Sequence, residues 1–150
     1  MTKMRTNSVI IAMVLGIIAL AARDTSSASF TYANYNLHGT YRITFTGFVP
    51  SSGRLQSGVG IFVLDGSGGL SGTEVFNNGG IVCRNVVVTG TYVLNGNGIG
   101  ELSADFTSSA PGCSGHFNST LLVYAGGGRV RAVSSDPSFV TISEEWLRDE

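Results

Sequence analysis

The sequence predicts an all-β protein, and among all-β folds it favours an antiparallel up-and-down β-barrel of about eight strands. Three observations lead to this fold class. After Phe30, apolar and polar residues alternate over short segments and show almost no helical spacing. Turn-forming residues divide the chain into eight or nine such segments, joined by short hairpins. Glycine occurs both at these turns and inside the segments, where it lets a sheet bend. Closure into a barrel removes sheet edges, so we favour it over the alternative, a β-sandwich.

The segment before the predicted sheet differs from the rest of the chain. Lys3 and Arg5 precede an uncharged apolar run over residues 8–22, in which Ala19 and Ala21 place small residues at the two positions that a signal peptidase reads. This order is typical of a secretory signal peptide. The run is shorter than the roughly 20 residues of a membrane-spanning helix, so we favour cleavage over an uncleaved membrane anchor. We therefore expect a signal peptide and short linker over 1–29 and a single barrel domain over 30–150.

The predicted cleavage also limits the function. Lys3 is the only lysine, and the chain from Ala22 onward carries a net charge near −3. Such a chain lacks the clustered cations that neutralise phosphates, so we expect no nucleic-acid partner. His38 and His116 form no metal-binding motif, and we expect no metal and no cofactor. The expected location is periplasmic or secreted, with no stable membrane insertion after cleavage.

The two cysteines, Cys83 and Cys113, predict a disulfide, because an even number of cysteines in an exported chain is usually paired. The bridge would close a loop of about 30 residues and stabilise the fold by roughly 3 to 4 kcal/mol. Two buried free thiols are the alternative.

Each strand is expected from its own pattern. In 39–49, Tyr41, Ile43 and Phe45 share one face while polar residues occupy the other. Segment 58–65 is apolar on both faces, so it needs cover on both sides or one face turned to an apolar cavity. The turn at 65–68, Asp-Gly-Ser-Gly, reverses the chain. Further strands are expected at 69–78, 81–95, 99–107, 116–125, 129–135 and 138–146. The charged tail, 147–150, is expected to fray.

Several of these motifs occur together in a known group of proteins. The tripeptide Gly-Thr-Tyr stands at 39–41 and again at 90–92, and the Asp-Gly-x-Gly turn at 65–68 is followed by Ser-Gly at 71–72. This pattern resembles a group of small exported bacterial proteins whose shape is similar to calycin-type barrels, which include lipocalins and allene oxide cyclase-like enzymes. The resemblance implies a barrel fold. The lipocalin Gly-x-Trp signature is not met, because Tyr41 stands at the tryptophan position, and no cyclase catalytic residue is carried over.

Four residues are candidates for a site inside the barrel. Glu74 shares its strand face with Leu70 and Phe76, so we expect it to point inward. A carboxylate in apolar surroundings has a raised pKa and can act as a general acid or base, which makes Glu74 the candidate catalytic residue. Pairing with Arg84 or Arg131 is the alternative. Three tyrosines are candidate ligand-binding residues, with core packing as their alternative role: Tyr41, Tyr92 and Tyr124.

These observations favour an exported barrel that binds a small apolar molecule or a partner protein without catalysis. One alternative is a cyclase or isomerase that acts on an apolar substrate inside the barrel. Another is a structural envelope protein. The sequence leaves open whether the protein is an enzyme, because fold class does not fix function.

Overall fold

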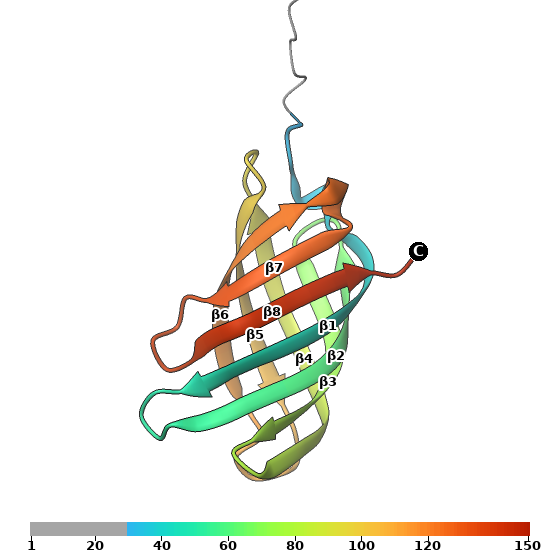
Figure 1. The fold of residues 1–150 in the computed structure, drawn as a ribbon. Helices are drawn as coiled ribbons and strands as arrows, with labels where there is room; N and C mark the ends of the chain where they lie inside the picture. The colour runs from blue at the N-terminus through green and yellow to red at the C-terminus, as the bar shows by residue number, and fades with distance from the viewer. Residues whose placement is uncertain (1–29) are drawn as a thin grey trace, which may run out of the picture.

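The computed structural model describes residues 30–150, so the predicted signal peptide lies outside the described residues. Eight antiparallel strands form a closed barrel in which each strand pairs with the next and β8 pairs with β1 (Figure 1). The predicted up-and-down barrel is therefore confirmed, and the β-sandwich alternative is wrong. Among the described residues no helix has the length and apolar character needed to cross a membrane.

The strands lie close to their predicted positions. They are β1 (His38–Val49), β2 (Arg54–Asp65), β3 (Gly69–Asn78), β4 (Ile81–Leu94), β5 (Ile99–Thr107), β6 (Gly115–Tyr124), β7 (Arg129–Ser134) and β8 (Val140–Arg148). Two short 3-10 turns, η1 (Asn34–Asn36) and η2 (Ala125–Gly127), complete the fold. The local alternation and the glycine-rich turns were thus sufficient to place the strands.

The expectation that the tail frays is wrong. The Arg148 N–H donates to the Gly128 carbonyl at 3.0 Å, and the Asp149 N–H donates to the Thr40 carbonyl at 2.8 Å. The Asp149 carboxylate also pairs with the Arg42 guanidinium at 2.9 Å. The tail is ordered because β8 is the closing strand of the barrel, and its end pairs with both neighbouring strands.

One end of the barrel is filled and covered. Trp146 is fully buried there and packs edge-on against Phe62, with ring centroids 5.3 Å apart. The segment before β1 covers this end, where the Asn34 side chain accepts a hydrogen bond from the Leu94 N–H at 2.7 Å. Leu37, in the same segment, is fully buried. The interior at this end is therefore a packed core.

The disulfide lies near the other end. Cys83, on β4, and Cys113, in the loop between β5 and β6, are bonded, with their Cα atoms 5.5 Å apart. Both residues are fully buried, and they pack against Phe76 and Val86. The predicted pairing is confirmed. A buried disulfide also indicates that the protein matures in an oxidising compartment.

Glycines inside the strands serve two different purposes. Gly47 lies at a register shift between β1 and β8, as expected for a bulge. Gly58 and Gly60 of β2 instead make room for larger side chains on β1 and β3. A Cβ atom at Gly60 would lie 2.9 Å from the Cβ of Glu74, and one at Gly58 would lie 2.7 Å from the Cβ of Phe76. Strand β2 therefore contributes no side chain of its own to the interior at this level, and side chains of the neighbouring strands lie against its backbone.

Strand β2 is also apolar on its outer face. Phe62 and Leu64 point inward and are buried, whereas Val59, Ile61 and Val63 point outward and are 45 to 58% exposed. The inner face of this segment thus turns toward the cavity, as one of the two predicted arrangements has it, whereas no residue of 30–150 covers the outer apolar face.

Candidate ligand cavity

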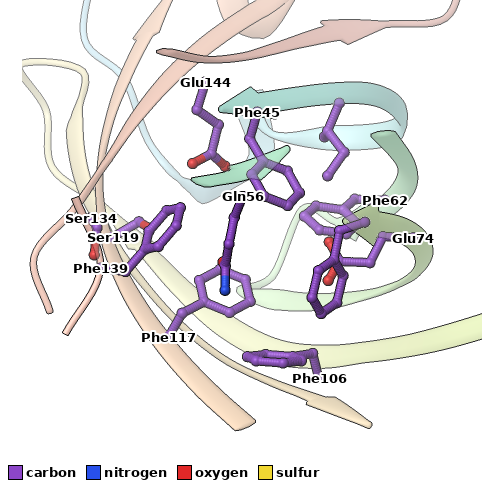
Figure 2. Close-up of a pocket in the computed structure, with 12 residues that line it drawn as sticks. Phe45, Gln56, Phe62, Glu74, Phe106, Phe117, Ser119, Ser134, Phe139 and Glu144 are labelled. Atoms are coloured by element: carbon purple, nitrogen blue, oxygen red, sulfur yellow. The ribbon is translucent and has the colours of Figure 1, made fainter. Parts of the chain in front are cut away.

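A cavity of about 70 Å³ lies inside the barrel at the end opposite the covering segment (Figure 2). Residues from β1, β2, β3, β5, β6, β7 and β8 and from the β7–β8 loop contribute to it. Most are apolar or aromatic, and they are Ile43, Phe45, Gln56, Phe62, Glu74, Phe76, Phe106, Phe117, Ser119, Ser134, Phe139 and Glu144. One water needs roughly 10 to 15 Å³ of such space, so the cavity can hold several waters or a small organic molecule.

Aromatic rings form much of the cavity wall. Phe76 lies between Phe45 and Phe106, with ring centroids 6.4 and 5.7 Å away. Phe117 continues the row beyond Phe106 at 6.2 Å, and Phe139 contacts Phe45 on the other side at 6.4 Å. Rings at these distances hold one another in place. The wall is therefore an ordered aromatic surface and not a set of separate side chains.

Two carboxyl groups reach into this aromatic cavity, Glu74 from β3 and Glu144 from β8 (Figure 2). Glu74 is 8% exposed. Within residues 30–150, no group donates a hydrogen bond to its carboxylate and no cation pairs with it. Glu144 is half-buried, and its Oε1 atom accepts a hydrogen bond from the Trp146 indole N–H at 2.8 Å.

Both carboxyl groups hold their protons more tightly than usual. Burial raises the pKa of Glu74 from 4.5 to about 7, and the negative charge of Glu144 adds to this rise. Burial likewise raises the pKa of Glu144 to about 7, although the indole N–H of Trp146 opposes the effect. Desolvation disfavours the charged form of a carboxyl group, which explains the direction in both cases. Near pH 7 each group therefore exists in both protonation states.

The structure places Glu74 in the interior, as its face-mates Leu70 and Phe76 predict. The alternative pairing with Arg84 or Arg131 is not found. Arg131 lies on the outer face and pairs with Glu145 at 3.7 Å, and Arg84 is exposed. A catalytic role for Glu74 stays a prediction.

Sequence reasoning missed Glu144. The signal that could have found it is its spacing of two residues from Trp146, which places both side chains on one face of β8. The acidic pair Glu144-Glu145 obscures this signal, since either residue could have been the inward one.

The three candidate tyrosines lie away from the cavity. Tyr41 is fully buried and its hydroxyl donates to the Gly127 carbonyl at 2.6 Å, while the Tyr92 hydroxyl donates to the Leu37 carbonyl at 2.6 Å. Both hydroxyl groups are thus used in covering the filled end of the barrel. The Tyr124 hydroxyl donates to Glu145 at 3.3 Å. Tyr41 and Tyr92 therefore pack in the core, which is the alternative to ligand binding that was predicted for them.

A second polar cluster lies on the outer face of β5 and β6. His116 Nδ1 is 2.8 Å from Asp105 Oδ1, and its Nε2 atom is 3.3 Å from Ser103 Oγ. These residue types match a hydrolytic triad. However, Ser103 lies between paired strands, opposite Thr91 and Asn118, so its backbone N–H belongs to the sheet and cannot stabilise an oxyanion. We therefore assign no hydrolysis to this cluster.

In comparisons with known proteins, no family model, no curated protein and no solved structure matches this chain. The closed eight-stranded barrel agrees with the calycin-like shape that the sequence resemblance implies, whereas membership of the exported bacterial group stays a prediction. Within residues 30–150, no group of three or more His, Cys, Asp or Glu side chains is placed to hold a metal ion.

Proposed function

We propose that the protein binds a small, largely apolar molecule inside the barrel and does so without catalysis. The observation that supports this function best is the contrast between the two ends of the interior. Trp146 and Tyr41 fill one end, whereas the other holds an aromatic cavity of about 70 Å³. Protein interiors are normally close-packed, and small barrels of this size can enclose one ligand. A filled barrel would have favoured the structural envelope protein instead.

We also propose that the protein acts outside the cytoplasm. The buried disulfide between Cys83 and Cys113 and the signal-like pattern of residues 1–29 support this location. Mass spectrometry of the protein from its native envelope fraction should find an N-terminus between Ala22 and Phe30. An intact Met1 in a membrane fraction would instead indicate an anchored protein.

The chain carries its own probe for ligand binding. Trp146 is the only tryptophan, and its indole N–H bonds to Glu144, which lines the cavity. A ligand that enters the cavity should therefore change the tryptophan fluorescence. Native mass spectrometry of the purified protein should in parallel detect a co-purified small molecule.

A cavity-filling variant tests the location of binding. Ser119 lines the cavity and is 3% exposed, so Ser119→Leu should fill part of the space and abolish the fluorescence response. The neighbouring Thr120 points away from the interior, and Thr120→Leu is the matched control that should keep the response. Binding that survives Ser119→Leu unchanged would place the ligand elsewhere and contradict the proposal.

A cyclase or isomerase that acts on an apolar substrate is the second candidate. The observation that favours it is the Glu74 pKa of about 7, which suits proton transfer at neutral pH. If Glu74→Gln keeps ligand binding but abolishes turnover of the bound molecule, the protein is an enzyme. If the bound molecule is recovered unchanged from the wild-type protein, the binding function stands.

A further inference from the structure

We infer that the molecule held in this cavity is a small organic cation, such as a protonated amine, with its charge between Glu74 and Glu144. The inference rests on the proposed function, because it requires that the cavity binds a ligand. It adds the chemical class of that ligand, and it follows from three features of the cavity.

The first feature is the absence of a protein cation near the two carboxyl groups. Of the residues that line the cavity, only Glu74 and Glu144 are titratable, and none is basic. Arg42 pairs with Asp149 and Arg131 with Glu145, both on the outer face, while Arg54 and Arg84 are exposed, and no arginine of residues 30–150 forms an ion pair with Glu74 or Glu144. Carboxylates removed from water are usually paired with a cation or with hydrogen-bond donors. In the described part of the chain, Glu74 has neither.

The second feature is the aromatic wall beside these carboxyl groups. Phe45, Phe76 and Phe106 form consecutive ring contacts, and all three line the same cavity as Glu74. The face of an aromatic ring carries a partial negative charge and attracts cations, including ammonium groups of ligands. Rings therefore favour the same charge as the carboxylates do, while they also accept the apolar part of the molecule.

The third feature is the poor fit of other ligand classes. An anionic ligand would be repelled by Glu74 and Glu144 and would contact the negative ring faces. A neutral apolar molecule would bury Glu74 still further and leave it unpaired, which is costly for a carboxylate. A cation pairs with the carboxylates and contacts the rings at once.

Proton linkage gives the inference a distinctive signature. Each carboxyl group has a pKa of about 7, so a cation must displace a proton before it forms the ion pair. Its affinity should therefore rise as the pH increases from 6 to 8, by about tenfold for each carboxyl group that must ionise. A neutral ligand that accepts a hydrogen bond from the protonated acid would show the opposite trend.

The test uses three probes of matched shape that are small enough for the cavity, namely butylamine, butanol and butanoate, with methylamine and methanol as a smaller pair. Binding is measured by titration calorimetry at pH 6 and pH 8 and by the fluorescence of Trp146. We expect each amine to bind at least tenfold more tightly than its alcohol at pH 8, to release protons on binding at pH 6, and to lose its preference over the alcohol in Glu74→Gln. Glu101→Gln, which changes an exposed carboxylate on the outer face of β5, should keep it.

The outcomes separate this inference from the function on which it rests. The inferred ligand class is wrong if the alcohols bind as tightly as the amines, or if the affinity for the amines decreases when the pH is raised from 6 to 8. In both cases the cavity still binds ligands. If no probe binds and no molecule co-purifies with the protein, the binding function itself is wrong, and the inference fails with it.

Discussion

The buried position of Glu74 predicts that a single substitution will stabilise the protein at alkaline pH. The substitution Glu74→Gln keeps the size of the side chain and removes its charge. The pKa of Glu74 is about 7 in the folded barrel, against an ordinary value of 4.5. Between these two values the folded state binds more protons than the unfolded state. The contribution of the protonated Glu74 to stability is therefore fully present below about pH 4.5 and is lost as the pH rises through 7.

The size of the effect follows from the same two values. Each pKa unit corresponds to about 1.4 kcal/mol, so a rise from 4.5 to about 7 lowers the wild-type free energy of unfolding by about 3 kcal/mol at pH 8. Glutamine has no charge to desolvate. The Glu74→Gln variant should therefore be more stable than the wild type by about 3 kcal/mol at pH 8, and by only about 1 kcal/mol at pH 5. The 3 kcal/mol already contains the repulsion between Glu74 and Glu144, because that repulsion is part of the rise in the pKa of Glu74.

Urea unfolding under non-reducing conditions at both pH values measures this difference directly. Glu101→Gln is the matched control, because Glu101 is an exposed carboxylate on β5 and its substitution should change the stability by less than about 0.5 kcal/mol. A Glu74→Gln variant that is no more stable than the wild type at pH 8 would refute the reasoning. It would mean that the Glu74 carboxylate is solvated or paired in the folded protein.

Two further predictions concern stability and the shape of the cavity. Replacing both Cys83 and Cys113 by serine should lower the free energy of unfolding by roughly 3 to 4 kcal/mol, as measured by urea unfolding, since the bridge closes a loop of 30 residues; an unchanged unfolding midpoint would contradict this. Gly60→Ala places a Cβ atom 2.9 Å from the Cβ atom of Glu74, so it should lower the free energy of unfolding by about 1 to 3 kcal/mol and weaken ligand binding. The control, Gly53→Ala in an open turn, should leave ligand binding unchanged. Equal binding by both glycine variants would show that β2 does not shape the cavity.

The strands could be predicted from the sequence because their signals are local. Alternation and glycine-rich turns fix each segment without reference to its neighbours, and the face shared with Leu70 and Phe76 was enough to orient Glu74. The cavity could not be predicted in this way. Alternation shows that Tyr41 points inward, but whether the interior at that level is filled depends on the side chains of all eight strands.

The end of the chain illustrates a different limit. Glu144 faces the cavity and Glu145 faces outward, yet both belong to the strand predicted over 138–146, whose sequence does not show which of the two acids points inward. The tail itself is ordered by hydrogen bonds to Gly128 and Thr40, which lie 20 and 109 residues before the donors Arg148 and Asp149 in the chain. Such long-range pairing follows from barrel closure and leaves no trace in the local sequence pattern.

The interior carboxyl groups are difficult to explain by stability alone. Removing two charges from water costs several kcal/mol unless partners compensate, and apolar replacements of similar volume often leave a protein equally or more stable. Strand β2 adds to this cost, because Gly58 and Gly60 contribute no side chain to the core at this level. Space, aromatic rings and the unpaired Glu74 carboxyl group thus occur together at one end of a barrel whose other end, around Tyr41, is filled. Functional sites commonly reduce stability in this way, because the groups that bind a ligand are left without partners until it arrives. A bound cation would supply the missing partner of Glu74. The ligand should therefore raise the free energy of unfolding most at alkaline pH, where that of the ligand-free protein is lowest.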